Sequence, residues 1–125
     1  METHHGVPLH LWNQAKEEIR GILNSVARRR GLISYSDLTA RMHTVQLTPD
    51  SNALHEMLGE VSVEEDTGSR GMLSVLVVHK VGDQKPGKGF FKLATRLGRD
   101  ASDSDSCWIT ELQTVYAAHA KRPEP

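Results

Sequence analysis

The chain has 125 residues, with 15 Lys and Arg against 16 Asp and Glu, a formal net charge of −1, and one cysteine, Cys107. One cysteine excludes an internal disulfide and a cysteine-rich zinc site, and no apolar run approaches the roughly 18 residues of a membrane span. The N-terminal METHHGVPLH lacks a basic region followed by an apolar one, so we expect no secretory signal and a cytoplasmic protein. The length predicts one domain over residues 1–125, with a core at about 9–120 and flexible tails at 1–8 and 121–125.

The first predicted helix is amphipathic. Its apolar stripe, at helical spacing, consists of Trp12, Ala15, Ile19, Ile22, Leu23 and Val26. Glu17 and Glu18 come early in this helix and the arginine triplet at 28–30 comes late, and both placements suit the helix dipole. Gly31 is well placed to end the helix in a left-handed conformation.

A short extended piece and a short second helix follow. The extended piece consists of Leu32, Ile33 and Tyr35. Ser36 is a good N-cap for a helix that ends near Met42, because its hydroxyl can accept a hydrogen bond from a backbone N–H of the first turn.

The third predicted helix is capped by Thr48 or Asp50. Its apolar face consists of Leu54, Met57, Leu58 and Val61. Gly59 lies inside this pattern, at a place where the helix could end or bend. The segment EEDTGSRG then reads as a polar connection rich in turn-forming residues.

The segment MLSVLVVHK, residues 72–80, predicts a strand covered on both faces, because nearly every position is apolar. A loop, VGDQKPGKG, leads into FFKLATRLGR, which could be a helix or a strand. As a helix, it would place Lys92, Arg96 and Arg99 on the face opposite its apolar side chains, with Gly98 as a candidate cap.

The last predicted helix begins at about Cys107, after the acidic segment DASDSDS. One side of it carries Trp108, Leu112, Val115, Tyr116 and His119. Cys107 is expected to be a small buried side chain, and Trp12, Trp108 and Tyr116 are expected to pack in the core.

The order of these elements predicts an α+β fold and resembles a small winged helix-turn-helix domain with an extra C-terminal helix. RRRGLISYSDLTARM is similar to the entry to the second helix in the DNA-binding half of the alkylguanine alkyltransferase-like proteins. That family's reactive proline-cysteine-histidine-arginine motif is absent, and Ser74 and Val75 stand in that region, which excludes alkyl transfer. The combination of MLSVLVV, PGKGFF and a final helix with Trp and Tyr also resembles a group of small uncharacterised bacterial proteins.

Charge is segregated along the chain into blocks of alternating sign. Residues 14–44 and 71–99 carry net charges of +3 and +5, whereas 45–70 and 100–125 carry −5 and −3. A basic 80–99 segment favours contact with nucleic-acid phosphate. The expected anion-binding residues are Lys80, Lys85, Lys88, Lys92, Arg96 and Arg99, with Arg28, Arg29 and Arg30 as an extension.

The third helix is poorly suited to the DNA major groove. It is expected to expose Asp50, Glu56 and Glu60, and carboxylates facing DNA phosphates are unfavourable. The sequence therefore predicts a non-enzymatic module that contacts nucleic-acid backbone with little sequence preference. The glycines of PGKGF could also let backbone N–H groups approach an anion, although a plain turn is the alternative.

Three alternatives remain open. The charge blocks could pair with one another inside the fold, or the protein could be an adaptor that docks a protein partner. The third is a small metal-dependent nuclease, with a metal near His79 or Glu60, although Val78 breaks the acid-then-Glu-x-Lys pattern. The seven histidines show no HxxxH or HxH spacing, and His4 and His5 fall in the predicted tail, so we expect no metal or cofactor.

Overall fold

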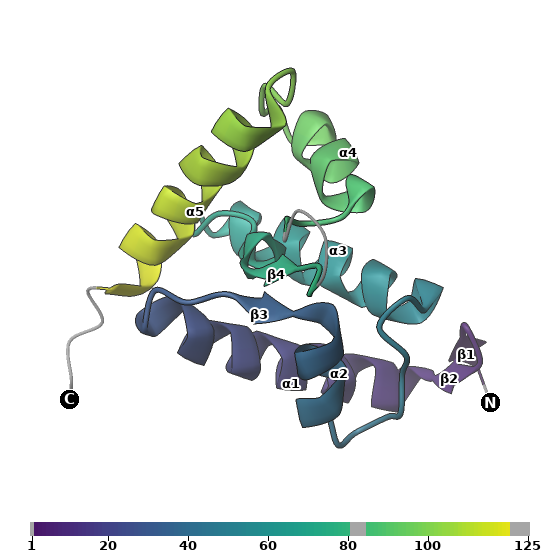
Figure 1. Ribbon diagram of the computed structural model, residues 1–125. Helices are drawn as coiled ribbons and strands as arrows, with labels where there is room; N and C mark the ends of the chain where they lie inside the picture. The colour runs from purple at the N-terminus through teal and green to yellow at the C-terminus, as the bar shows by residue number, and fades with distance from the viewer. Residues whose placement is uncertain (1, 81–84, 121–125) are drawn as a thin grey trace.

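Helices make up most of the described part of the chain, residues 2–80 and 85–120, in this computed structural model (Figure 1). They are α1 (Leu9–Arg28), α2 (Tyr35–Arg41), α3 (Asn52–Thr67), α4 (Lys88–Arg96) and α5 (Ser104–Ala120), with one 3₁₀ turn, η1 (Leu73–Leu76). The strands have two residues each: β1 (Thr3–His4), β2 (Val7–Pro8), β3 (Ile33–Ser34) and β4 (Val77–Val78). The mixture of helix and strand is compatible with the predicted α+β class.

The strands form two separate pairs. β1 and β2 make an antiparallel hairpin, whereas β3 and β4 pair in parallel, with Ile33 opposite Val77 and Ser34 opposite Val78. The parallel pair joins the start of α2 to the end of the apolar segment, and Gly87, just before α4, is hydrogen-bonded to Tyr35 of α2. In the residues described, none of the helices is long and apolar enough to cross a membrane.

The core lies where α1, α3, η1 and α5 meet. α1 packs against the other three, and α4 packs against α3 (Figure 1). The larger side chains at less than 2% exposure are Ile19, Leu23, Leu38, Leu54, Met57, Met72, Leu73 and Leu76. Burial of so many aliphatic side chains, at roughly 1.5–3 kcal/mol each, supplies the main driving force for folding.

The apolar segment at 72–78 is buried throughout, as predicted, but it is not one strand. It forms η1 and only then the two residues of β4. Ser62 of α3 explains the difference, because its Oγ accepts a hydrogen bond from the backbone N–H of Ser74 at 2.9 Å and donates one to the Ser74 Oγ at 2.6 Å. The Ser62 side chain thus accepts the hydrogen bond of the Ser74 N–H, which in a strand would go to a carbonyl of a neighbouring strand.

The N-caps of α2 and α3 are two serines that the sequence did not predict as caps. Ser34, not Ser36, caps α2, and its Oγ accepts from the backbone N–H of Asp37 at 3.0 Å. Ser51, rather than Thr48 or Asp50, caps α3 by accepting from the N–H of Leu54 at 3.1 Å. Several Ser, Thr and Asp residues precede each helix, and all of them have suitable chemistry.

Of the three glycines predicted as possible helix ends, Gly31, Gly59 and Gly98, only Gly98 has the expected left-handed conformation after its helix. Arg30, not Gly31, has the positive φ, 54°, at the end of α1, while Gly59 lies inside α3 without ending it. Gly98 has a φ of 93° just after α4, as predicted for a left-handed cap. α5 begins at Ser104, three residues before Cys107, and its Cys107 side chain is buried as predicted.

The predicted N-terminal tail instead forms the β1–β2 hairpin on the N-terminal end of α1. Val7 is buried at 9% exposure. The apolar Val7 and the positive-φ Gly6 are the features that the tail prediction overlooked. The predicted C-terminal tail, 121–125, lies outside the described residues, as does the loop segment 81–84.

Candidate nucleic-acid interface

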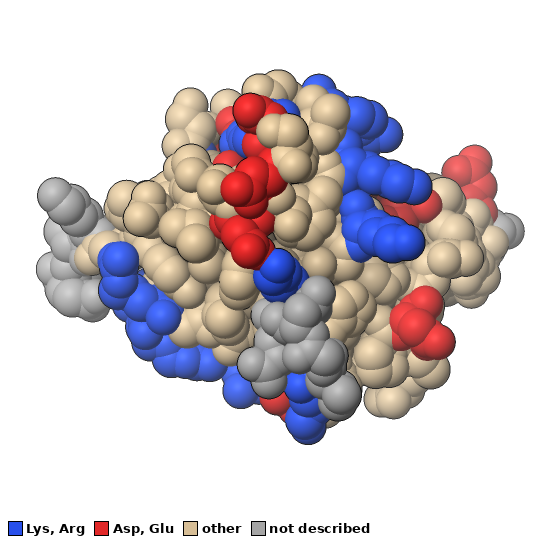
Figure 2. Space-filling view, turned by 45° about the horizontal axis from the view of Figure 1, so that its top comes forward, with Lys and Arg blue, Asp and Glu red and all other residues tan. Residues whose placement is uncertain are grey.

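α4 presents a cationic face to solvent. Lys88, Lys92 and Arg96 lie at i, i+4 and i+8 of this helix and are all exposed, while Phe90, Leu93 and Ala94 are buried on the other side. In Figure 2 a group of Lys and Arg side chains covers the upper right of the surface, where α4 lies in Figure 1. The helical alternative for this segment is therefore the observed one.

The cations of this face are not paired with acids in the described part of the chain. Within residues 2–80 and 85–120, no ion pair joins Lys88, Lys92 or Arg96 to a carboxylate. We name these three residues the α4 cationic face. Their charge is consequently available to an external anion.

The other cations of the predicted 80–99 site contact acidic side chains. Lys80 lies 3.8 Å from Asp37, in an exposed pair, and Lys85 pairs with Asp105. Arg99 lies beyond the end of α4, so it does not extend the α4 cationic face as the i+7 position of a longer helix would. Its guanidinium instead binds two carboxylates between helices.

The arginine triplet at 28–30 lies far from the α4 cationic face. It lies at the C-terminal end of α1, at the left of Figure 1, whereas α4 lies at the upper right. Arg30 stacks on the ring of Tyr116 with 5.0 Å to its centroid, and the Tyr116 hydroxyl donates to the Gly31 carbonyl at 2.7 Å. Arg28 and Arg29 are exposed, but the fold does not join them to α4 in one surface.

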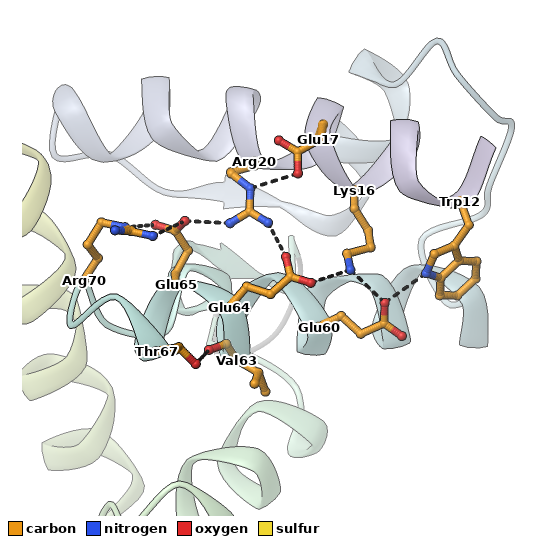
Figure 3. A network of polar contacts seen from close by, with 10 residues as sticks. All are labelled: Trp12, Lys16, Glu17, Arg20, Glu60, Val63, Glu64, Glu65, Thr67 and Arg70. Atoms are coloured by element: carbon orange, nitrogen blue, oxygen red, sulfur yellow. Dashed lines mark hydrogen bonds and ion pairs between the residues drawn. The ribbon is translucent and has the colours of Figure 1, made fainter. Parts of the chain in front are cut away.

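Three acidic side chains of α3, those of Glu60, Glu64 and Glu65, pair with cations of α1 (Figure 3). Lys16 Nζ lies 3.1 Å from Glu60 and 2.6 Å from Glu64. Arg20 contacts Glu64 and, at 2.6 Å, the buried Glu65. The opposite blocks at 14–44 and 45–70 therefore pair with each other, as the internal-pairing alternative expects, and leave the α4 cationic face out of the network.

Burial and ion pairing act in opposite directions on this network. Burial alone would raise the pKa of Glu65, but hydrogen bonds from Arg70 and Arg20 outweigh it and hold that pKa below its usual range. Burial would likewise lower the pKa of Lys16, and its hydrogen bonds to Glu64 and Glu60 outweigh that effect and raise it. Both groups are therefore charged near neutral pH.

A groove of about 610 Å³ runs between α3 and α4. Its apolar lining consists of Leu58, Val63, Phe90 and Leu93. Lys92 and Arg96 also line the groove, opposite the glutamates of α3. Figure 3 shows Val63 pointing away from α1, toward this groove, and its side chain is 38% exposed.

The PGKG loop is held against Tyr35 at one end of the groove. The backbone N–H of Gly87 donates to the Tyr35 hydroxyl at 3.0 Å, so this N–H is not directed at an external anion. The Tyr35 ring lies 5.1 Å from the rings of both His55 and His79, and burial raises the pKa of its hydroxyl.

The predicted nuclease residues do not come together. Glu60 accepts a hydrogen bond from Trp12 Nε1 at 2.9 Å and pairs with Lys16, whereas His79 packs on Tyr35. The His, Cys, Asp and Glu side chains that the described residues do gather at metal-binding distance are His4, His5 and Glu56. Sequence spacing gives no sign of this cluster, because it joins residues more than fifty positions apart.

Comparisons with known proteins identify no relative of this chain. No family model, no curated protein and no solved structure matches the chain. The functional proposals below are therefore argued from the chain's own residues.

Proposed function

We propose that this protein is a non-enzymatic, winged-helix-like binding module that contacts the phosphate backbone of nucleic acid through the α4 cationic face. The observation that carries the proposal is the exposure of Lys88, Lys92 and Arg96 along one side of a helix, without an ion pair in the described residues. Three cations that lie along one side of a helix and pair with none of the described acids are suited to a polyanion. The winged-helix likeness rests on the order of α1, β3, α2 and α3 before an apolar segment.

The spacing of these cations suits a nucleic-acid strand. Eight residues of α-helix from Lys88 to Arg96 span about 12 Å at 1.5 Å per residue. Successive phosphates of one DNA strand are about 3.4 Å apart along the axis. The α4 cationic face therefore matches a stretch of roughly three or four phosphates.

The pairing of Glu60, Glu64 and Glu65 with Lys16 and Arg20 is compatible with this mode of binding. Because α1 compensates them, these glutamates oppose a bound phosphate less than unpaired carboxylates would. These carboxylates offer no hydrogen-bond donors to base edges, so we expect binding to nucleic acid without sequence preference.

Fluorescence anisotropy with a labelled 20-base-pair duplex, at 25 to 200 mM salt, tests the proposal. Binding should weaken steeply with salt, because each phosphate contact releases a counterion. The logarithm of the binding constant should fall with the logarithm of the salt concentration by about 0.9 for each contact. Changing Lys88, Lys92 and Arg96 together to Ala should reduce the log–log slope by up to about 3 and remove most of the affinity.

A charge-preserving variant, K88R/K92R/R96K, is the matched control and should retain binding. A scrambled duplex of equal length should bind equally well. Absence of binding at 25 mM salt, or a triple Ala variant that binds like the parent protein, would contradict the proposal.

A protein-binding adaptor is the second candidate, and the groove between α3 and α4 favours it. Its lining is apolar at Val63 and Phe90 and carries Lys92 and Arg96 beside them. The discriminating variant is Val63→Asn, which makes the groove polar without adding a negative charge beside Lys92 and Arg96. An adaptor would lose its co-purifying partner in this variant, whereas a nucleic-acid module would lose little binding.

A further inference from the structure

The N-terminal hairpin turns on two residues with positive φ. His5 has a φ of 52° and Gly6 a φ of 79°, and His4 and Val7 are paired on either side of them. This is the geometry of a two-residue type I′ turn, which matches the right-handed twist of the flanking strands. The turn gives the two adjacent histidines a fixed backbone on the N-terminal end of α1.

Both histidines face one carboxylate of α3. His4 Nε2 contacts Glu56 Oε2, and His5 Nε2 lies 2.9 Å from Glu56 Oε1. The three ligand atoms lie within 4.8 Å of one another. The same nitrogen of each ring is thus directed at the same small volume, and each carboxylate oxygen faces a different ring.

Trp12 holds the two imidazoles in place. Its ring, on the buried face of α1, lies 4.5 Å from the His4 ring and 5.9 Å from the His5 ring, in an edge-on and a stacked arrangement. Trp12 Nε1 in turn donates to Glu60, one turn along α3 from Glu56. Both rings therefore pack against a buried tryptophan that is itself hydrogen-bonded to α3.

Glu56 differs from the other glutamates on this side of α3. Glu60 and Glu64 pair with Lys16, whereas no ion pair in the described residues joins Glu56 to a lysine or arginine. The side chains of His4, His5 and Glu56 are 43%, 35% and 38% exposed. An ion can reach these atoms from solution, and water can complete its coordination.

We propose that His4, His5 and Glu56 form a binding site for a divalent transition-metal ion of the zinc class. Two imidazole nitrogens and one carboxylate oxygen are ligands that Zn²⁺, Co²⁺ and Ni²⁺ accept. Three protein ligands leave at least one coordination position to water. Bound metal would tie the hairpin to α3, since two ligands come from one element and the third from the other.

Calorimetric titration of the chelator-treated, full-length protein with Zn²⁺, and separately with Co²⁺, tests this site. We expect saturable binding of one ion per chain and a higher melting temperature with metal, because an ion bound only by the folded state stabilises it. The Co²⁺ absorption spectrum should report nitrogen ligation. In a Trp108→Phe background, Ni²⁺ or Cu²⁺ should quench the emission of Trp12, which contacts both ligand rings.

Three variants assign the ligands. His4→Ala, His5→Ala and the nearly isosteric Glu56→Gln should each weaken Zn²⁺ binding by at least about tenfold, while circular dichroism verifies that the fold is kept. His10→Ala and His43→Ala are the matched controls, each removing an exposed histidine, and should bind like the parent. Binding that is unsaturable, or that Glu56→Gln and His5→Ala leave unchanged, would overturn the proposal.

The metal site and the α4 cationic face are independent. Glu56 also lines the groove between α3 and α4, but none of the α4 cations is a ligand of the proposed site. Loss of Zn²⁺ binding in Glu56→Gln with unchanged duplex binding would support the site, and failure of duplex binding in the parent protein would not affect it.

Discussion

Arg99 and Glu111 form a two-point ion pair inside the fold. Arg99 Nε donates to Glu111 Oε1 at 3.1 Å, and Nη2 donates to Oε2 at 3.0 Å. The same guanidinium donates to both carboxylate oxygens of Asp66, at 2.6 and 3.1 Å. The Glu111 side chain is only 4% exposed and also accepts from the backbone N–H of Met72 at 2.8 Å. One arginine therefore joins α3, α5 and the residues after α4.

Arg99→Ala should destabilise the protein by roughly 3–5 kcal/mol, because it leaves the buried Glu111 without its counter-charge. Urea denaturation followed by circular dichroism measures this change. Arg28→Ala, an exposed arginine at the end of α1, is the control and should change the free energy of unfolding by less than about 0.5 kcal/mol. Equal effects of the two variants would show that the Arg99 pairs contribute nothing.

Stability should fall as the pH drops below about 4, the ordinary range of carboxyl groups. Hydrogen bonds from Arg99 lower the pKa of Asp66 in the folded protein, and those from Arg70 and Arg20 lower that of Glu65 against the effect of burial. Because these folded-state pKa values lie below the unfolded ones, the stabilisation is complete above the unfolded values and is lost as the pH falls through the folded values. Urea midpoints measured from pH 6 to pH 2 check this, and Asp66→Asn should flatten the curve.

The α4 cationic face should contribute little to stability. We expect the free energy of unfolding of K88A/K92A/R96A to lie within about 1 kcal/mol of that of the parent protein, because exposed charges that pair with none of the described acids add little to the folded state. The same urea denaturation tests it. A loss of several kcal/mol would mean that these residues pair with acids after all, and it would remove the main argument for an anion-binding function.

The two apolar side chains Leu76 and Trp108 should differ in their importance. Leu76 is fully buried in η1, so Leu76→Ala should cost roughly 2–5 kcal/mol. Trp108 is only partly buried, with its Nε1 donating to the Val75 carbonyl at 3.3 Å, so Trp108→Ala should cost less than a full core truncation. Thermal unfolding of both variants compares them, and a larger loss for Trp108→Ala would contradict this ranking.

The periodic parts of the fold could be predicted from the sequence. The stripe of α1 from Trp12 to Val26, and the apolar face of α3, both lie in the core as their spacing indicates. For the segment of α4 the spacing leaves helix and strand both open, and the structure has the helix, which places Lys92 and Arg96 on the exposed face. Local periodicity succeeds here because one face of each helix meets the same core.

The long-range contacts of the site could not be predicted. Nothing local distinguishes Arg99, which binds Asp66 and Glu111, from Lys92, which pairs with none of the described acids; the difference arises because α4 ends at Arg96. The contact of His4 with Glu56 likewise depends on a hairpin turn and on the packing of α3, which are set by tertiary structure. For the same reason the sequence predicts a strand over 72–78, whereas residues 73–76 form a 3₁₀ turn whose Ser74 N–H is hydrogen-bonded to Ser62 of α3.

The parallel pairing of β3 with β4 has a consequence for the order of folding. Ile33 and Val77 are partners across roughly 44 positions of chain, and each strand has only two residues. Closing so long a loop costs entropy that the contacts of four residues offset poorly, so we expect this pair to form only after α1 and α3 have packed. We therefore expect β3 and β4 to join late, when α1 and α3 already hold their ends together, and mutations there to accelerate unfolding more than they slow folding.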